Sequence, residues 1–309
     1  MACDHVSVIE EASRAVPAPA PSSQAAPGRP AEIEEGSNRF LIHPMSRALV
    51  NRLIATPVTP NQISVSSMVA AALGAAAYFA LAWPWNAFLG LAWFILWHVL
   101  DGADGDLARR TGRASPQGEL IDGICDHVSQ VILYVTFGFI LKRTLGWSAA
   151  WWAVGAGVAH FIQANAYETG RKTYRRWVYG AAWMRQTTGA EPATSGWAGR
   201  AYIAFSNLFS PGEAVREAAM EPVIAAGGAP AADARARYRA SQAPLVKRSA
   251  ILSSNTRTLA AFLSMLAGSP IWFFAFTLVV QTMAMVLMLI IRARNNRSLA
   301  AALGDTARL

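Results

Sequence analysis

The sequence predicts an all-α membrane protein with six transmembrane helices and an amphipathic helix that lies in the membrane interface. Hydrophobic residues make up 53% of the 309 residues and charged residues only 15%. Apolar runs of about 20 residues, the length that a bilayer requires, alternate with short polar turns. The eleven tryptophans stand mostly beside these runs, as in the aromatic belts of membrane proteins. Together these features exclude an ordinary soluble domain.

The part of the chain before the first apolar run divides into two segments. Residues 1–37 are rich in Ala, Pro, Ser and Glu, so we expect a disordered tail. Residues 38–55 mix apolar side chains with Arg39, Arg47 and Arg52, which is typical of a helix lying in the interface. A soluble helix packed on a partner is the alternative for this second segment.

The apolar runs define the predicted spans and the domain that they form. The six spans are expected at roughly 63–83, 87–108, 116–141, 147–167, 250–268 and 270–291. Pro60 ends the preceding helix, and Asn61 is a suitable cap for the first span. We expect one six-span domain over residues 56–295, followed by a C-terminal tail over 296–309. An insert at about 185–248 separates the fourth and fifth spans, and its Ala-, Gly- and Pro-rich stretch 225–243 is typical of a flexible linker.

The formal net charge of +8 is concentrated in the loops between spans. This distribution fits helix orientation and contact with anionic lipids, and it predicts no nucleic-acid partner. Six spans place both termini on one side of the membrane, and the most basic loops lie on that side. The positive-inside rule therefore predicts that the second-to-third turn faces the cytoplasm. We expect an integral protein of a bacterial inner membrane.

Four aspartates at that turn carry the clearest chemical signal, and they are Asp101, Asp104, Asp122 and Asp126. Spacings of three and four residues put each pair on one face of its helix. Ser115, a suitable N-cap, and Pro116 begin the second of these helices, so the sequence predicts a helical hairpin in which the two pairs face each other.

A bound divalent cation is the simplest explanation for these acids. Carboxylates beside membrane spans cost free energy, and converging like charges repel one another. Ligands that are all oxygen atoms favour Mg²⁺ or Mn²⁺ over zinc. The alternative is a solvated loop with ion pairs to Arg109, Arg110 and Arg113, and this is what we expect for Asp106 and Glu119.

Residues 101–126 resemble the signature of the CDP-alcohol phosphotransferase family, D-x2-D-G-x2-A-R-x8-G-x3-D-x3-D. All eight fixed positions match, and they are Asp101, Asp104, Gly105, Ala108, Arg109, Gly118, Asp122 and Asp126. The resemblance implies displacement of CMP from a CDP-linked donor by an alcohol. It also implies an integral membrane homodimer that uses a divalent metal.

The same resemblance implies roles for individual residues. Asp101, Asp104, Asp122 and Asp126 would be metal ligands, and Asp126 would also be the base that activates the alcohol. The donor would be bound by Asn61, Asp104, Gly105, Ala108, Arg109 and Gly118. Gly118 would let the second and third spans approach each other. Residues 56–64, TPVTPNQIS, are similar to the start of the first span in the family, with Ser64 in place of Thr. For Asn61, simple helix capping is the alternative.

A basic cluster directly after the fourth span is the candidate site for an acceptor phosphate. Arg171, Lys172, Arg175 and Arg176 are spaced so that they cluster on one side of a continuing helix, and the first three are the candidates for holding the phosphate. Arginine and lysine there suit a phosphate ligand. An ordinary positive-inside flank is the alternative.

The sequence therefore favours a phospholipid-synthesising transferase. The expected donor is CDP-diacylglycerol, and the expected acceptor is a polar alcohol such as inositol phosphate or glycerol phosphate. The stretches ARRTGRASP and GELIDGICD are also similar to choline and ethanolamine phosphotransferases, which move a headgroup from a CDP-amino-alcohol to diacylglycerol. A hypothesis of another class is a divalent-cation transporter, although Arg109 beside the acids disfavours a cation route.

Overall fold

The computed structural model describes residues 30–181 and 209–306. Most of the predicted tail and the first part of the predicted insert, residues 1–29 and 182–208, lie outside the described residues, as do residues 307–309. The described chain is helical and has no strand. Its elements are η1 (Asn38–Ile42), α2 (His43–Leu53), α3 (Pro60–Ala80), α4 (Trp85–Arg110), α5 (Pro116–Leu145), η2 (Gly146–Ser148), α6 (Ala149–Tyr179), α8 (Glu213–Ala226), α9 (Gly228–Arg248), η4 (Ser249–Leu252), α10 (Ser254–Leu266), α11 (Ile271–Ala275), η5 (Phe276–Gln281) and α12 (Thr282–Thr306).

Four helical stretches of the described chain are long and apolar enough to cross a membrane. They are Pro60–Ala80, Trp85–Arg110, Gln117–Tyr179 and Ile271–Gly304. The third stretch contains both α5 and α6. The chain reverses direction between these two helices at Gly146, whose φ of +58° favours glycine. The predicted fifth span corresponds to α10, which has 13 residues and is shorter than the roughly 20 that a bilayer needs. The count of six spans therefore stays a prediction.

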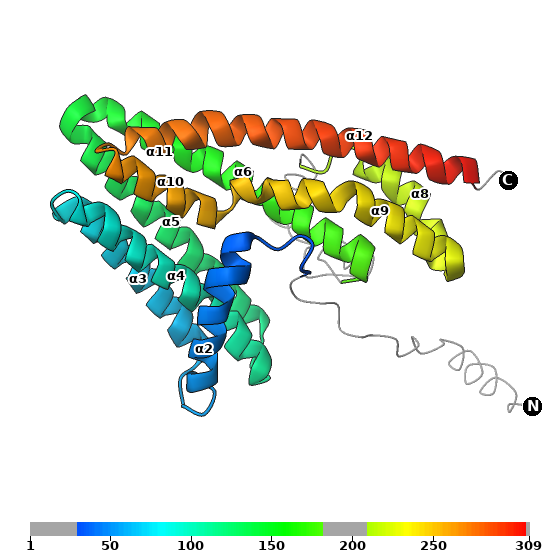
Figure 1. Ribbon diagram of the computed structural model, residues 1–309, viewed down its shortest axis with the longest axis horizontal. Coiled ribbons are helices and arrows are strands. Elements are labelled where there is room, and N and C mark those ends of the chain that lie inside the picture. The colour runs from blue at the N-terminus through cyan, green and yellow to red at the C-terminus, as the bar shows by residue number, and fades with distance from the viewer. Residues whose placement is uncertain (1–29, 182–208, 307–309) are drawn as a thin grey trace, which may run out of the picture.

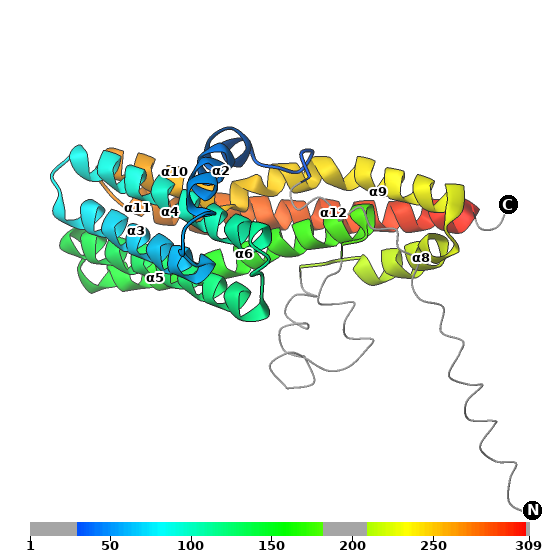
Figure 2. The same ribbon diagram turned by 90° about the horizontal axis from the view of Figure 1, so that it is seen from below.

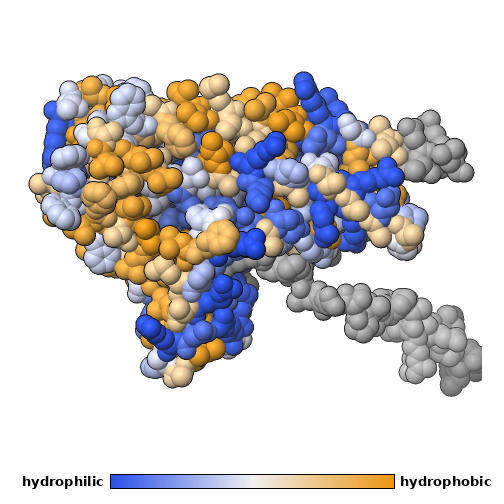
Figure 3. Space-filling view, in the orientation of Figure 1, coloured by the Kyte–Doolittle hydropathy of each residue, from blue (hydrophilic) through white to orange (hydrophobic). Residues whose placement is uncertain are grey.

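The long helices lie side by side along the long axis of the molecule and form one bundle (Figures 1 and 2). Helix α3 packs on α4 and α5, α5 on α6, and α6 on the run from α11 to α12, while α10 packs on α4. Aromatic side chains fill the end of the bundle near the α3–α4 turn. The aromatic ring of Phe137 has its centroid 5.2 Å from that of Tyr78 and 5.2 Å from that of Phe273. Apolar side chains cover the surface over α3, α4 and α10, whereas polar ones gather over α2 and α9 (Figure 3).

The starts of α3 and α5 are fixed by side-chain caps. Ser115 accepts a hydrogen bond from the Gly118 amide at 3.1 Å, which confirms the predicted cap of α5. The prediction for α3 was wrong, because Thr59 is its cap and forms a capping box with Gln62. Asn61 lies instead in the first turn of α3, where its side chain is not used as a cap.

Helix α2 crosses α4 at close range. Ser46 donates a hydrogen bond to the carbonyl oxygen of Val99 at 2.8 Å. A Cβ atom on Gly102 would lie 2.8 Å from the Ser46 hydroxyl, so only glycine permits this approach. The outer side of this region exposes Phe40 and Met45. Its predicted place in the membrane interface stays a prediction.

The Ala-, Gly- and Pro-rich stretch 225–243, predicted as a flexible linker, is largely helical. It spans the end of α8 and most of α9. The small side chains of Ala231 and Ala234, together with Tyr238, form a buried face three to four residues apart, which packs against α6. Composition indicated a linker. The small residues recur on one face of the helix, however, so that α9 can pack closely against α6.

Residues 30–37, which the sequence places in the tail, pack against the end of α6. Ile33 is buried in a cluster with Tyr174 and Trp177. Glu32 accepts hydrogen bonds from the hydroxyls of Tyr174, at 3.0 Å, and Tyr179. The hydrogen bonds of Glu32 and the buried side chain of Ile33 thus attach this short segment to α6, although its composition is typical of disorder.

Candidate active site

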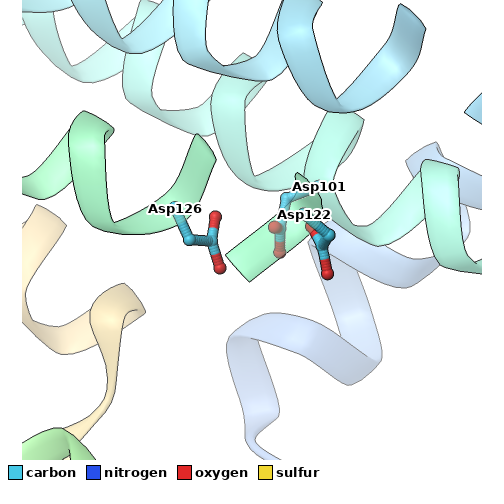
Figure 4. Close-up of side chains that lie close together, drawn as sticks. All are labelled: Asp101, Asp122 and Asp126. Atoms are coloured by element: carbon cyan, nitrogen blue, oxygen red, sulfur yellow. The ribbon is translucent and has the colours of Figure 1, made fainter. Parts of the chain in front are cut away.

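Three of the four predicted aspartates converge on one point (Figure 4). Asp101 comes from α4, and Asp122 and Asp126 come from α5. Each offers a carboxylate oxygen, and these oxygens lie within 4.8 Å of one another. Helices α4 and α5 are brought together because both pack on α3. The four-residue spacing on α5 then aims two carboxyl groups at the third.

The fourth aspartate, Asp104, lies beside this group and is held by protein donors. It is 3% exposed, and it accepts hydrogen bonds from the Ser64 hydroxyl at 2.5 Å and from the Gly105 amide at 2.5 Å. The carboxylate of Asp122 lies close enough to repel the negative charge of Asp104. Asp104 therefore borders the cluster but is not among the three acids whose oxygens share one point.

The chemistry of the donor set fits a hard divalent cation. All the converging atoms are carboxylate oxygens, and Asp101 and Asp126 lie close enough to share a hydrogen bond. One buried oxygen of Asp126, Oδ1, has no hydrogen-bond partner among the described residues. Half-buried carboxylates at this range repel one another unless a cation or shared protons compensate their charge, and oxygen ligands favour Mg²⁺ or Mn²⁺.

The predicted donor-binding residues fall into two groups near the acids. A Cβ atom on Gly118 would lie 3.5 Å from the Asn61 side-chain oxygen, so the first turns of α3 and α5 meet there. Gly118 thus serves the contact of α5 with α3, not the predicted contact of the second and third spans. A Cβ atom on Gly105 would lie 3.2 Å from the Arg109 guanidinium. Ala108 is half-buried on the same helix.

The arginines at the end of α4 have their own acidic neighbour. Asp106 pairs with Arg110 at 3.0 Å and more loosely with Arg109 at 3.8 Å, as the sequence predicted for this acid. Arg110 also donates a hydrogen bond to Asn51 at 2.7 Å. The Arg109 side chain is 58% exposed, so it is available to a ligand at the mouth of the site.

The basic cluster lies on α6, which continues beyond the apolar part to Tyr179 as predicted. Arg171 pairs with Glu168 at 2.7 Å. The prediction was wrong for Arg176, which pairs with Glu217 of α8 at 2.8 Å and does not join the other three. The buried Nε atoms of Arg171 and Arg175 have no hydrogen-bond partner among the described residues. Lys172 is half-buried beside them.

A cavity of about 650 Å³ begins at the acids and extends along α5 and α6. Asp101 and Asp126 line one part of it, and Arg171 and Glu168 line the part next to the basic cluster. His98 of α4 lines the cavity and contacts the Thr258 hydroxyl at 2.9 Å. The aspartates and Arg171 thus share one continuous space.

Two cavity residues could not be identified as site residues from the sequence. Glu35, in the predicted tail, accepts hydrogen bonds from the Tyr167 hydroxyl at 2.5 Å and from Asn255 at 2.9 Å, and it lines the cavity. Arg257 of α10 also lines the cavity and is 1% exposed. An arginine inside an apolar run is a signal for Arg257, since such residues are rare in membrane segments. Glu35 had no comparable signal.

Comparison with known proteins matches residues 57–195 to the sequence model of the family described as CDP-alcohol phosphatidyltransferase. Cholinephosphotransferase 1 from Gallus gallus is 39% identical over 67 residues, which cover 22% of this chain and 19% of that protein. A bifunctional IPC transferase and DIPP synthase from Rubrobacter xylanophilus is 36% identical over 81 residues, which cover 26% of this chain and 18% of that protein. These two matches thus span about a fifth of each relative.

The family match covers helices α3 to α6, including the converging aspartates and the basic cluster. It gives no support to a cation transporter, because both similar proteins are named as transferring or synthesising enzymes. The converging aspartates and the basic cluster therefore lie in the part of the chain, residues 57–195, that is similar to CDP-alcohol phosphatidyltransferases.

Proposed function

We propose that the protein is a phospholipid-synthesising transferase that displaces CMP from a CDP-linked donor by an alcohol. The observation that carries this proposal is the group of three carboxylates within 4.8 Å of one another, two of which, Asp101 and Asp126, line a 650 Å³ cavity. A pyrophosphate donor has negative charge that must be neutralised, and a cation held by such a group supplies that neutralisation. We propose CDP-diacylglycerol as the donor, because apolar side chains form much of the cavity wall.

Asp101, Asp122 and Asp126 would hold Mg²⁺ or Mn²⁺, with Asp104 as a further ligand. When bound, the metal would stabilise negative charge on the pyrophosphate and on departing CMP. Asp126 would accept the proton of the attacking hydroxyl through its unpartnered Oδ1. Ser64 would keep the Asp104 carboxylate oriented through their 2.5 Å hydrogen bond.

The nucleotide end of the donor would lie where α3, α4 and α5 meet. Asn61 and Gly118 are close together there, and the small Ser115 side chain is the other group within 4 Å of the position that a Gly118 Cβ atom would take. Gly105 and Ala108 would let the donor approach the α4 backbone. Arg109 would exchange its loose contact with Asp106 for the donor phosphates, since a bidentate phosphate pair is stronger than an exposed ion pair at 3.8 Å.

The acceptor would be a polar alcohol that carries a phosphate, such as inositol phosphate or glycerol phosphate. Arg171, Lys172 and Arg175 would hold that phosphate, and the unpartnered Nε atoms of the two arginines support this role. The Arg171–Glu168 pair is then a contact that keeps Arg171 in position before the acceptor binds.

A second candidate is transfer of a headgroup from a CDP-amino-alcohol to diacylglycerol. The match to a protein named cholinephosphotransferase favours it. So do the carboxyl groups of Glu35 and Glu168 in the cavity, since they would attract a cationic headgroup. The two candidates use the same aspartates and differ in which substrate carries the lipid.

Both candidates require a membrane setting with the aspartates on the side of the nucleotide. We propose that α3, α4, α5, α6, α10 and the α11–α12 run are the six spans, with the site open to the cytoplasm. The domain would then extend from about residue 56 to 295, with α2 in the interface. We also propose a homodimer, which the family resemblance implies.

The test is CMP release by purified protein in lipid with Mg²⁺. One arm offers CDP-diacylglycerol with a panel of phosphorylated and plain alcohols, and the other offers CDP-choline or CDP-ethanolamine with diacylglycerol. We expect release in one arm, its loss in Asp126→Asn, and no change in Asp233→Asn, whose exposed carboxylate pairs with Arg237 on α9. Absence of CMP release from every pair, or Mg²⁺ flux into liposomes without CMP release, would overturn the proposal.

A further inference from the structure

Arg257, near the start of α10, is a buried cation in the wall of the cavity. Its guanidinium donates hydrogen bonds to the carbonyl oxygen of Leu252 at 2.5 Å and to the side-chain oxygen of Gln163 at 2.8 Å. Its Nε has no partner, and no carboxylate of residues 30–181 or 209–306 forms an ion pair with it. Because a buried guanidinium with a free donor is costly, this arrangement indicates a ligand acceptor atom.

A row of unpartnered polar atoms connects Arg257 with the aspartates. Asp126, Gln130 and Tyr134 stand four residues apart on α5 and therefore share one face. All three line the cavity, and each has a buried polar atom without a hydrogen-bond partner in the described chain. Tyr134 interacts with Arg257, and it lies about 12 Å along α5 from Asp126. The polar row thus leads from the acids toward the middle of the apolar helices.

Apolar side chains of α5 and α6 beside these polar atoms indicate the route by which a ligand enters the cavity. Val131, Val135, Val154 and Phe161 line the cavity and are also 48–59% exposed on the outer surface. These side chains belong to α5 and α6, which face lipid in a membrane-spanning bundle. The cavity therefore communicates with the lipid-facing flank between α5 and α6. An occupant that reaches Arg257 by this route is itself a lipid.

We propose that Arg257 and Tyr134 bind the ester carbonyl oxygens of a diacyl glycerolipid substrate whose polar end lies at the aspartates. This inference rests on the proposed function. Ester carbonyls are a few bonds removed from the headgroup of a glycerolipid, on the side of its acyl chains. They accept hydrogen bonds and donate none, which matches the free N–H of Arg257 and the hydroxyl of Tyr134. The protein would therefore select ester-linked over ether-linked lipids.

The experiment compares CMP release from CDP-diacylglycerol and from its dialkyl ether analogue in the same detergent. A parallel arm compares diacylglycerol with dialkylglycerol as acceptors for CDP-choline, so that the two arms distinguish a donor lipid from an acceptor lipid. We expect the wild type to use the ester lipid with a kcat/KM about tenfold or more above that for the ether, because hydrogen bonds to a charged group are strong.

Two variants and one control assign the preference to these residues. Arg257→Gln should reduce the ester-to-ether ratio to near one, and Tyr134→Phe should reduce it by about threefold. Tyr78→Phe is the matched control, because Tyr78 is also buried with an unpartnered hydroxyl but does not line the cavity. Its ratio should equal that of the wild type. Should Arg257→Gln not fold, the Tyr134→Phe ratio decides the question.

Two results would overturn the inference while the proposed function stands. One is equal use of ester and ether lipids by the wild type. The other is a proportional loss on both lipids in Arg257→Gln and Tyr134→Phe, which is what a structural role predicts. A wild type that releases no CMP from any lipid pair would instead overturn the proposed function itself.

Discussion

The protein contains two buried groups of charged side chains that differ in how their charges are compensated. At the candidate active site, three carboxylates lie within 4.8 Å, and Asp126 keeps a buried oxygen without a partner. Between α6, α8 and α9, the 1% exposed Arg216 pairs with Glu213 at 3.0 Å. Its guanidinium also lies 5.1 Å from the Trp177 ring and 5.2 Å from the Tyr238 ring.

The comparison separates a group of like charges from one in which each charge faces an opposite charge. Opposite charges and aromatic faces around Arg216 compensate each other within the chain, so that group stabilises the docking of α8 and α9. Burial there also raises the pKa of the Tyr238 hydroxyl. Like charges around Asp126 are compensated only from outside. Substitutions in the two groups should therefore change different measured properties.

Asp126→Asn tests the uncompensated group and should have the largest effect. Loss of the base should lower CMP release by about 10²- to 10⁴-fold. The thermal midpoint should hold or rise, because one of several repelling charges is removed. Activity assays and thermal unfolding in the same detergent measure both quantities. Turnover close to that of the wild type would contradict the assigned role.

Arg216→Ala tests the compensated group. It removes the 3.0 Å ion pair of the buried Glu213, which should cost about 3–5 kcal/mol of stability. The fraction that remains folded should release CMP at nearly the normal rate, because Arg216 does not line the cavity. Thermal unfolding measures the change in stability, and CMP release per amount of folded protein measures the change in activity. A variant with an unchanged midpoint would show that the pair contributes no stability.

Metal removal should affect the candidate active site and leave the Arg216 group unchanged. Chelation should abolish CMP release, and Mg²⁺ or Mn²⁺ should restore it. Saturating the site at about a hundred times the dissociation constant should stabilise the fold by about 2.7 kcal/mol. Asp122→Asn should reduce this stabilisation, whereas Arg216→Ala should retain it. Equal metal stabilisation in both variants would place the ion elsewhere.

The adjacent residues Arg175 and Arg176 extend the comparison to a smaller effect. Arg175→Gln should raise the KM for a phosphorylated acceptor about tenfold, since it removes a charged hydrogen-bond donor. Arg176→Gln should leave this KM unchanged and lower stability modestly, because it breaks the pair with Glu217. Steady-state kinetics with varied acceptor measures the contrast. A similar KM change in both variants would support the positive-inside flank as the role of the cluster.

Local spacing explains how much of the site could be predicted from the sequence. The helical positions of Asp122 and Asp126, the cap at Ser115 and the continuation of α6 depend on neighbours within a few residues. The bond from Ser64 to Asp104 joins residues that are 40 positions apart and depends on how α3 packs on α4. The cavity position of Glu35 depends on contacts with α6 and α10. Such long-range contacts leave no periodic pattern in a single sequence.

The contacts of residues 30–38 determine when the cavity is finished during synthesis. Glu35 binds Tyr167 and Asn255, which leave the ribosome 132 and 220 residues later. Asn38 likewise binds Asn255. The earliest described segment must therefore wait for α10 before it can take its place beside the aspartates. A nascent chain that has inserted only α3 to α6 holds the four acids but lacks this wall, so the cavity is completed only near the end of translation.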